Sequence, residues 1–389
     1  MSETAAILKQ AQAGNAHFYV QFGGQGAPWY KELAKYYKEP AFQKFFDAAL
    51  SAIDEERPRV EGSVGLPHGI DARGWLEDDS KIPSEDYLGC AAVSIAMIQM
   101  AQLAHLENLL QNGFPMNDMV ANLAGTTGHS QGLIPASLVA LNRSGDEYYA
   151  AVNKYMKYLL YLGVSAQKAF PHFEATAEEN AKSEELGGKA PSPMVAVLGL
   201  DHDTIQKMVD EVNTGLPEDQ KIYISLYNSP TNRILSSYRG SLIAFHEKYK
   251  ADIDEKKFKF VYLRTTCPFH CKLMEPVREF FLPEIERIGF DYKGEELKVP
   301  VYSFYDQANL QESGAKLPVK MFEDMAINPL YWDKSMAPAV ADKKVTHILD
   351  FGPGKTSQRL SADTLKELGR EIPVLGAAIP KDLKEILGS

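Results

Sequence analysis

Residues 119–132 read MVANLAGTTGHSQG, and an apolar run begins at Leu133 directly after them. The first six residues are typical of a short buried strand, the glycines of a tight turn, and the residues from Leu133 of a helix. A strand that ends in a glycine-rich turn also occurs at residues 17–26, before a helix over about 29–37, and at residues 346–354; residues 299–304 add a fourth short strand. Buried strands joined by helices predict an α/β fold with a parallel-sheet core.

A second unit is indicated after a helix over residues 148–170 and a polar linker over 173–193. The order that follows is strand, helix, strand, strand, helix, strand, at residues 194–198, 202–212, 222–227, 233–237, 240–249 and 258–263. This βαββαβ order is the ferredoxin-like arrangement. We therefore expect residues 1–190 and 264–389 to form the core, and residues 191–263 to form an inserted ferredoxin-like subdomain.

The longest apolar stretch covers residues 87–110, and its polar members argue against a membrane span. Gln99, Gln102, His105 and Glu107 interrupt it, and a bilayer would not tolerate them together. A helix start at residue 84 and a stop at Gly113 predict one long, buried helix instead.

The composition excludes several classes of protein. The chain has 389 residues, with 41 Lys and Arg against 52 Asp and Glu, and its net charge is −11. Because it lacks a basic excess, a nucleic-acid partner is not expected. Three cysteines make no disulfide framework, and the opening MSET lacks the pattern of a signal peptide, so we expect a cytoplasmic protein without a membrane partner.

Gly128-His129-Ser130-Gln131-Gly132 matches Gly-x-Ser-x-Gly, the pattern of a nucleophile elbow, between a predicted strand and a predicted helix. Glycines permit the sharp turn, the Ser130 hydroxyl points outward, and the next backbone N–H faces a developing oxyanion. The alternative is a plain turn in which the serine caps the helix.

A nucleophilic serine needs a base, and the chain has nine histidines. His270, between Cys267 and Cys271, follows the last strand of the inserted unit, where the chain re-enters the core; the alternative is a surface-loop histidine. His129 is turned away by the elbow, and His105 is expected in the core. The cysteines lack a zinc spacing, so we predict that they are structural and that there is no metal site.

Gln25, in the glycine-rich turn after the first strand, is placed to offer a backbone N–H to the same site from the next strand end. Such a turn also resembles a nucleotide loop. However, the sequence contains neither Gly-x-Gly-x-x-Gly nor Gly-x-x-x-x-Gly-Lys-Ser/Thr. A nucleotide cofactor is therefore not expected.

Over residues 18–360 the chain resembles the malonyl/acetyl-CoA:acyl-carrier-protein transacylases. The motifs that carry this resemblance occur in the family's order: FGGQG at 22–26, GTTGHSQG at 125–132, NSP at 228–230, PFH at 268–270, PVYS at 300–303, PLYW at 329–332 and DFGPG at 350–354. The Gly-His-Ser-Gln-Gly form, Gln102 with His105, and Leu162-Gly-Val look most like the acetyl-type transacylase domain of fungal and actinobacterial multifunctional fatty acid synthases. A relative is the starter-unit transacylase domain of fungal polyketide synthases.

The resemblance implies a hydrolase-like core and a ping-pong reaction in fatty acid or polyketide synthesis. Ser130 would take an acyl group from coenzyme A and pass it to the phosphopantetheine thiol of an acyl carrier protein, with His270 as base and then acid and with no permanently bound cofactor. Backbone N–H groups of Gln25 and Gln131 would form the oxyanion hole, and Asn228 would bind substrate. A main-chain carbonyl near residues 324–328 would orient His270, and no triad aspartate is expected. Two residues depart from the family pattern, Met325 and Cys271.

One sequence position indicates which acyl group the protein transfers. Malonyl-type members carry an arginine about where Leu162 stands, and this chain has no arginine between Arg143 and Arg233. A free carboxylate without a partner there would cost several kcal/mol. We therefore expect a short neutral acyl group, acetyl first, unless one of the lysines on the same helix reaches inward: Lys154, Lys157 and Lys168.

Three other functions use or retain the same residues: a malonyl-specific transacylase, an acyl-thioester hydrolase, and a docking domain with a degenerate site. An acidic side chain bonded to His270 would favour hydrolysis, and a carbonyl would favour transfer.

Carrier proteins of this class are expected to be acidic. We therefore expect a local positive patch that binds the carrier, with Arg264, Lys272 and Lys355 as candidates.

Overall fold

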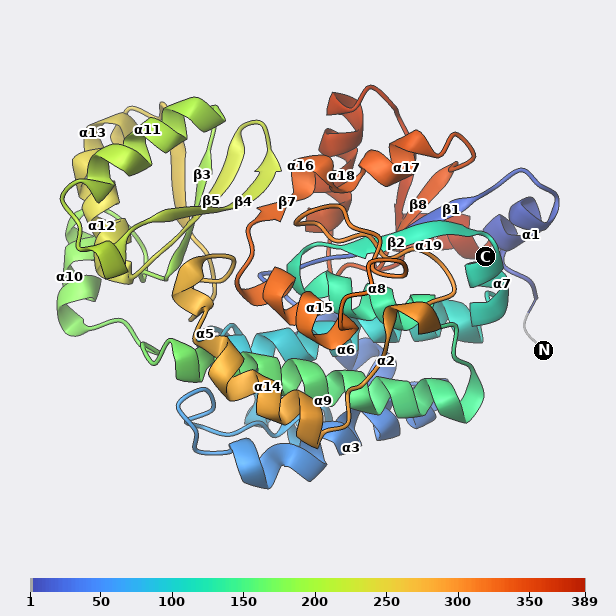
Figure 1. The fold of residues 1–389 in the computed structure, drawn as a ribbon. Coiled ribbons are helices and arrows are strands. Elements are labelled where there is room, and N and C mark those ends of the chain that lie inside the picture. Colours follow the sequence, from blue (N-terminus) through green and yellow to red (C-terminus); the bar gives the residue numbers. More distant parts are fainter. Residues whose placement is uncertain (1–2, 389) are drawn as a thin grey trace.

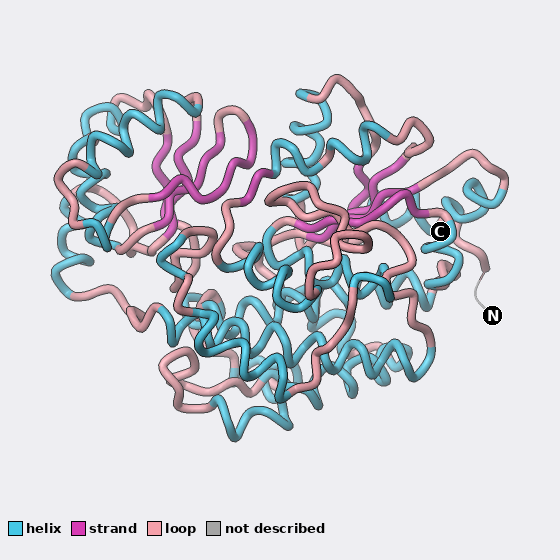
Figure 2. Tube along the Cα trace, in the orientation of Figure 1, coloured by secondary structure: helices cyan, strands magenta, loops and turns pink. Residues whose placement is uncertain are grey.

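Two β-sheets lie side by side in the computed structural model, which describes residues 3–388 (Figure 1). The core sheet has the order β2-β1-β8-β9, and the second sheet has the order β6-β3-β5-β4-β7. Figure 2 shows the two groups of strands separately, with a layer of helices below the core strands.

The core sheet is parallel throughout, as the sequence predicts. Its strands are β1 (Phe18–Phe22), β2 (Leu123–Gly128), β8 (His347–Asp350) and β9 (Val374–Gly376). Phe22 pairs with Gly128, and Gln21 pairs with Asp350. The carboxyl ends of β1, β2 and β8 therefore lie at one edge, and the three glycine-rich turns meet there.

Long helices cover the core sheet, and α6 (Ala91–Gln111) is the most enclosed of them. Every side chain of α6 from residue 91 to residue 109 is buried, including the polar side chains of Gln99, Gln102, His105 and Glu107. It packs against α9 (Gly145–Ala169), which also contacts α3 (Gln43–Val60) and α14 (Val277–Arg287) (Figure 1). No helix within residues 3–388 combines the length and the apolar character that a membrane span needs.

The other helices of this part have 4 to 12 residues. They are α1 (Ala6–Gln12), α2 (Tyr30–Tyr37), α4 (Ala72–Glu77), α5 (Glu85–Leu88), α7 (Met116–Ala121), α8 (Leu133–Ala140), α15 (Leu317–Ala326), α16 (Trp332–Ser335), α17 (Ala337–Ala341), α18 (Thr356–Glu367) and α19 (Pro380–Leu387).

The second sheet confirms the predicted βαββαβ order. Along the chain, the elements of this part are β3 (Met194–Leu198), α11 (His202–Asn213), β4 (Tyr223–Ser229), β5 (Asn232–Ser236), α12 (Arg239–Lys248), α13 (Lys250–Asp254) and β6 (Lys259–Tyr262). One face, with Val195 and Leu235, packs on α11 and α12 as a small core of its own. The other face, with Leu226 and Ile234, joins the main core.

A strand from outside the inserted unit completes this sheet. β7 (Leu330–Tyr331) pairs with β4 in parallel, at Leu226 and Tyr227. The boundaries at residues 191 and 263 stay a prediction, but the sheet itself draws on both parts of the chain.

Four local predictions were wrong. The strand predicted over residues 119–124 is displaced: residues 119–121 are the end of α7, and β2 begins at Leu123 and continues through the residues predicted as a turn, because Gly125, Thr126 and Thr127 pair with β1. The predicted linker 173–193 contains α10 (Ala177–Glu185), which begins with a capping box from Thr176.

The long helix predicted over residues 84–113 is interrupted. It breaks at Gly89 and Cys90, where Cys90 is extended and the next N–H donates to Thr266 Oγ1 at 3.0 Å. Residues 299–304 contribute an isolated bridge, Val301 to Thr126, rather than a strand. At residue 90, a contact with Thr266, distant in sequence, interrupts the local helical pattern.

Candidate active site

Ser130 and His270 meet at the carboxyl edge of the core sheet. The distance from Ser130 Oγ to His270 Nε2 is 2.7 Å, and both side chains are buried. Ser130 directly follows the turn after β2, and His270 lies in the segment between β6 and α14. The structure thus brings together the predicted nucleophile and the predicted base, although 140 positions separate them.

The turn around Ser130 needs glycine on both sides. A Cβ atom on Gly128 would lie 1.9 Å from the carbonyl carbon of Gly132, and one on Gly132 would lie 2.3 Å from the Phe22 oxygen. The N–H of His129 also donates to Phe22 O at 2.9 Å, which ties the turn to β1. Ser130 itself has φ of 55°, the strained conformation of a nucleophile elbow.

A main-chain carbonyl orients the base. His270 Nδ1 lies 2.9 Å from the carbonyl oxygen of Asn328, and the His270 backbone N–H donates to Ala326 O at 2.8 Å. Because a carbonyl only accepts hydrogen bonds, Nδ1 carries the proton and Nε2 is free to accept one from Ser130. The carbonyl falls in the predicted range 324–328, whereas the sequence alone did not identify Asn328 as its residue; the only signal was that Asp324 and Asn328 are spaced i, i+4 around a helix end.

Burial keeps this histidine neutral. Desolvation is the main cause that lowers the pKa of His270 to about 3, while the hydrogen bond to Asn328 opposes the shift. Burial likewise lowers the pKa of His129 to about 4. At neutral pH both imidazoles are uncharged, so His270 can accept a proton.

His129 is turned away from Ser130, as expected, and contacts the second sheet. Its Nε2 lies 2.8 Å from Asn228 Oδ1, and its ring packs edge-on against Trp332. Asn228 is buried on β4. The structure therefore places Asn228 behind the elbow, bonded to His129, and its predicted contact with substrate stays a prediction.

The two backbone N–H groups predicted to form the oxyanion hole belong to Gln25 and Gln131. Outside helices and strands, and within residues 3–388, neither N–H donates to another backbone group. Their side chains are fixed on α6: Gln25 Nε2 donates to Ser94 Oγ at 2.5 Å, and Gln131 Nε2 donates to Ile95 O at 3.0 Å. The role of the two main-chain donors in an oxyanion hole stays a prediction.

The side chain of Gln102 holds the turn that carries Gln25. Its Nε2 donates to Gly23 O at 2.7 Å and to Gly352 O at 2.9 Å, which joins the turns after β1 and β8. A Cβ atom on Gly24 would lie 2.6 Å from His129 Nδ1, so this turn also approaches the elbow closely.

Leu162 is fully buried on α9. Its neighbour Gly163 packs so closely on the first turn of α6 that a Cβ atom would lie 2.6 Å from Ala92 Cα. The same part of α6 anchors Gln25 and Gln131, so Leu162 lies near the segment that carries the site.

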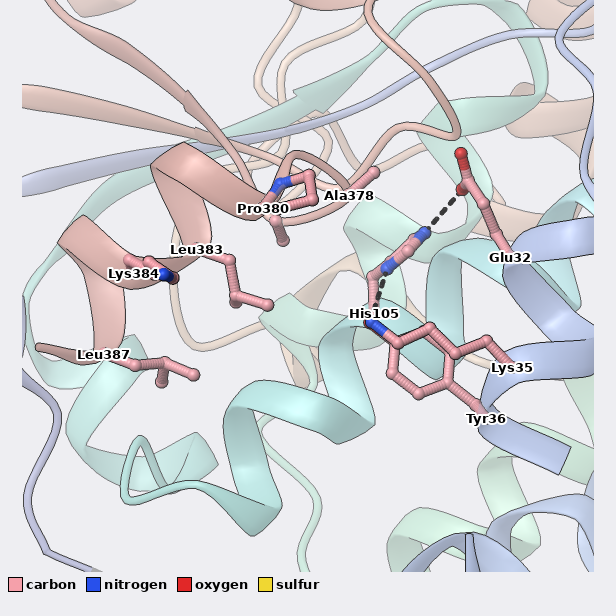
Figure 3. A pocket seen from close by; sticks show the side chains of 10 residues that line it. Glu32, Lys35, Tyr36, His105, Ala378, Pro380, Leu383, Lys384 and Leu387 are labelled. Carbon is pink, nitrogen blue, oxygen red and sulfur yellow. Dashed lines mark hydrogen bonds and ion pairs between the residues drawn. The ribbon is translucent and has the colours of Figure 1, made fainter. Parts of the chain in front are cut away.

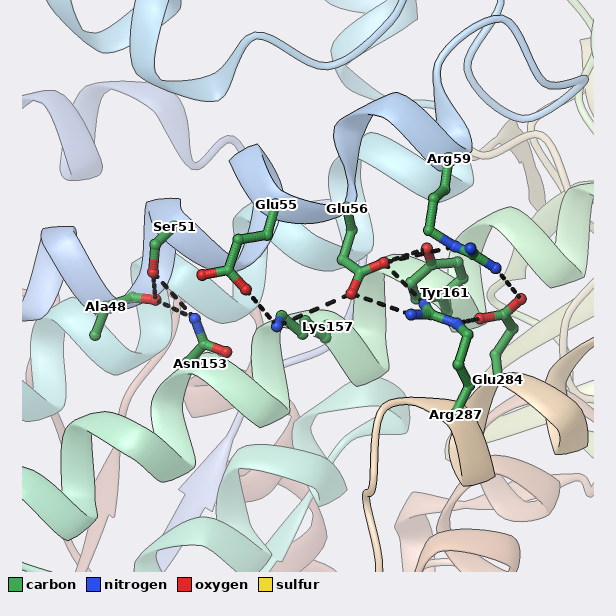
Figure 4. A network of polar contacts seen from close by, with 10 residues as sticks. All are labelled: Ala48, Ser51, Glu55, Glu56, Arg59, Asn153, Lys157, Tyr161, Glu284 and Arg287. Carbon is green, nitrogen blue, oxygen red and sulfur yellow. Dashed lines mark hydrogen bonds and ion pairs between the residues drawn. The ribbon is translucent and has the colours of Figure 1, made fainter.

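The three lysines on α9 are engaged elsewhere or exposed. Lys157 Nζ lies 2.6 Å from Glu55, within a network that also contains Glu56 and Arg287 and joins α3, α9 and α14 (Figure 4). Lys154 donates to Gly289 O at 2.9 Å, and Lys168 is exposed.

A cavity of about 290 Å³ lies between α2, α6 and α19, away from Ser130 and His270 (Figure 3). His105 lines it and is held by Glu32 at 2.7 Å and by the Tyr36 hydroxyl at 3.2 Å. His105 is thus a paired core histidine, as the sequence predicts.

The cysteines are free and buried in the part of the chain that the structure describes. Burial raises the pKa of Cys90 and of Cys271 to about 12, so neither thiol is reactive at neutral pH. Among residues 3–388, no cluster of three or more His, Cys, Asp or Glu side chains could hold a metal ion.

Comparison with known proteins gives consistent matches. A family model described as "Starter unit:ACP transacylase in aflatoxin biosynthesis" matches residues 20–270. The chain is 27% identical over 377 residues to the fatty acid synthase subunit beta of Saccharomyces cerevisiae, which covers 91% of this chain but only 18% of that protein. The chain therefore spans less than a fifth of this curated relative.

Solved structures share the fold. An acyl-carrier-protein S-malonyltransferase from Burkholderia pseudomallei is similar with a TM-score of 0.68 at 19% identity, and the match covers 96% of this chain and all of that one. A malonyl-transacylase in complex with a type II polyketide synthase acyl-carrier protein also has a TM-score of 0.68, at 18% identity, over 96% of this chain and 99% of that one. These likenesses confirm the hydrolase-like α/β fold.

Proposed function

The chain belongs to the starter unit:ACP transacylase family, and from this premise we propose that it moves a short neutral acyl group from coenzyme A to an acyl carrier protein through an acyl-serine. The observation that carries this proposal is the 2.7 Å contact between Ser130 Oγ and His270 Nε2, with His270 Nδ1 bonded to a carbonyl. The product would serve fatty acid or polyketide synthesis. No permanently bound cofactor is needed, because the acyl-CoA and the carrier's phosphopantetheine are both substrates.

In the first half-reaction, Ser130 Oγ attacks the thioester carbonyl carbon while His270 Nε2 takes the hydroxyl proton. The carbonyl oxygen becomes an oxyanion, and the backbone N–H groups of Gln25 and Gln131 stabilise it. When the intermediate collapses, the carbon–sulfur bond breaks and the leaving thiolate of coenzyme A takes the proton from His270. The acyl group is then an ester on Ser130.

The second half-reaction runs through the same groups in reverse. His270 Nε2 takes the proton of the phosphopantetheine thiol, and the sulfur attacks the ester carbonyl. Collapse of the second oxyanion breaks the bond to Ser130 Oγ, which regains its proton from His270. Both half-reactions therefore need a neutral His270, and burial supplies it.

Transfer is favoured over hydrolysis by the group behind His270. The carbonyl of Asn328 occupies the place where an acidic side chain would stand in a Ser-His-acid hydrolase.

Three cations are candidates for the surface that binds the carrier protein. Arg264 pairs with Glu85 at 2.9 Å, and Lys272 pairs with Glu218 at 3.7 Å. Lys355 is exposed and forms no ion pair within residues 3–388, which leaves it open to an acidic carrier protein.

The neutral acyl group is proposed from the surroundings of α9. Leu162 is buried, and the lysines of α9 are exposed or paired on other faces. A malonyl carboxylate in such a place would lack a bidentate partner. Acetyl is the simplest group that fits.

The test is the intact mass of the purified protein after brief incubation with separate acyl-CoAs. We expect a mass increase of one acetyl group with acetyl-CoA and a smaller occupancy with malonyl-CoA, and none with Ser130→Ala. Occupancy that decays in buffer without a carrier, as fast as it decays with one, would indicate a hydrolase instead. No increase with any acyl-CoA would indicate a degenerate site.

A further inference from the structure

A buried carboxyl group lies close behind the carbonyl that orients His270. Asp324 of α15 is fully buried, and its oxygens accept hydrogen bonds from Ser303 Oγ at 2.7 Å, from Lys320 Nζ at 2.9 Å and from Asn328 Nδ2 at 2.9 Å. A buried carboxyl group with this many partners holds them in fixed positions. None of these hydrogen bonds joins the carboxyl group of Asp324 directly to His270.

The contact with Asn328 matters most for the site. Asn328 follows the end of α15, where its backbone N–H donates to Glu323 O at 2.8 Å. Its side chain reaches back to Asp324, and its carbonyl accepts a hydrogen bond from His270 Nδ1. Asn328 is therefore fixed at three points, and a backbone rotation that moved its carbonyl away from His270 would also disturb the contact between its amide and Asp324.

The helix end adds a second contribution at His270. Ala326, the last residue of α15, accepts from the His270 backbone N–H, and the carbonyl of Asn328, two positions later, accepts from the ring Nδ1. This end of a helix carries partial negative charge and favours a positively charged imidazolium. It thus supports the charge that His270 gains when it takes the proton of Ser130.

We infer that Asp324 is a positioning residue for the Ser130 and His270 pair, acting through the side chain of Asn328. Its carboxyl group orients the histidine indirectly, whereas the acid of a Ser-His-acid site orients it by direct contact. The inference rests on the proposed acyl transfer for its effect on rate, whereas its effect on the histidine tautomer is independent of substrate.

The experiment compares Asp324→Leu with Asp306→Asn. Asp306 is the matched control, because its carboxyl group also binds Lys320, at 2.7 Å, but does not contact Asn328. Asn328→Ala is the second variant, since it removes the amide without leaving a cavity at Asp324, and it decides the matter if Asp324→Leu does not fold. Far-UV circular dichroism and thermal unfolding establish folding for each protein.

The first measurement is the ¹⁵N spectrum of histidine-labelled protein, with His270→Ala used to assign the signal of His270. We expect the parent and Asp306→Asn to show His270 protonated at Nδ1 alone. Asp324→Leu and Asn328→Ala should show a second population protonated at Nε2. An unchanged tautomer in both variants would overturn the inference.

The second measurement is the rate of acyl-enzyme formation. Asp324→Leu should lower kcat by about tenfold to a hundredfold and change KM for acyl-CoA less than about twofold, because it disturbs orientation rather than binding. Addition of Asn328→Ala should cause little further loss, since both changes break one interaction. An equal loss in Asp306→Asn would show that only the ion pair with Lys320 matters, and would overturn the inference.

The two proposals fail separately. If the parent takes no acyl group from any acyl-CoA, the proposed function is wrong, and the tautomer comparison still decides the role of Asp324. If the parent is acylated and the tautomer does not respond to either variant, the proposed function stands and the inference is wrong.

Discussion

Ser130 and His270 both have left-handed backbones, with φ of 55° and 63°, and their side chains meet at 2.7 Å. Residues other than glycine rarely adopt this conformation, and it costs on the order of 1–3 kcal/mol at each position. The fold therefore holds two strained residues against each other. Two separate segments hold them: the carbonyl of Phe22 accepts from His129 next to Ser130, and the carbonyls of Ala326 and Asn328, at the end of α15, accept from His270.

Ser130→Ala should abolish acyl-enzyme formation and leave the fold intact. The hydroxyl is the proposed nucleophile, and its only polar contact in residues 3–388 is with His270. Intact mass after incubation with acetyl-CoA measures the first effect, and thermal unfolding measures the second. Full acylation of this variant would remove Ser130 from the mechanism.

His270→Ala should slow both half-reactions by about a hundredfold or more, which is the usual scale for the loss of a general base. The two steps are measured separately, as acylation by acetyl-CoA and as transfer from pre-acylated protein to a carrier. If only one step slows, the shared acid and base role is wrong.

Stability should fall as the pH drops below about 6.5. Burial lowers the folded-state pKa of His129 to about 4 and that of His270 to about 3, from the ordinary value of 6.5. Below 6.5 the unfolded chain therefore binds more protons than the folded chain, and the folded state loses stability until the pH reaches the folded pKa values. For His129 alone the full effect is on the order of 3 kcal/mol.

Urea unfolding at pH 7.5, 6 and 5 measures this effect. His270→Ala should lose less stability over this range than the parent, because one buried histidine is gone. Parallel losses in the two proteins would contradict the assignment of the effect to His270.

Leu162→Arg should raise malonyl transfer relative to acetyl transfer. A buried bidentate partner for a carboxylate contributes about 2–5 kcal/mol, which corresponds to roughly 30-fold to 5,000-fold in selectivity. The measurement is kcat/KM for acetyl-CoA and malonyl-CoA in the parent and the variant. Leu162→Met, which keeps an apolar side chain of similar size, is the control. A parent that prefers malonyl-CoA would refute the acetyl assignment.

Lys355→Glu should weaken transfer to an acidic carrier protein more than Arg264→Glu does, since Arg264 already pairs with Glu85. Acylation by acetyl-CoA should not change in either variant. The comparison is made at low salt, where electrostatic steering is strongest. Equal transfer by Lys355→Glu and the parent would eliminate Lys355 from the docking surface.

The sequence was sufficient to predict the elements that local residue patterns determine. Ser130 could be found because Gly128 and Gly132 are required by contacts shorter than any side chain allows, and such glycines leave a fixed spacing in the sequence. The βαββαβ order could be read because its strands alternate toward two different cores.

The remaining features depend on contacts that no local pattern encodes. Asn328 serves through its carbonyl, which every residue has, so its side-chain type does not reveal the role. β2 extends through Gly125, Thr126 and Thr127, which favour a turn by themselves, because β1 offers them a buried partner. The pair β4 and β7 joins segments about a hundred positions apart.

That last pair limits how the protein can be recombined. β7 begins at Leu330, two positions after the carbonyl of Asn328, and its partner strand β4 carries Asn228, which binds His129 beside the nucleophile. A chimera that exchanged residues 191–263 alone would set a foreign β4 against the native β7. The mismatch would reach the base through Asn328 and the elbow through His129 at the same time. Grafts between relatives should therefore exchange β7 together with the inserted strands, so that the junctions between native and foreign sequence lie away from the base and from the elbow.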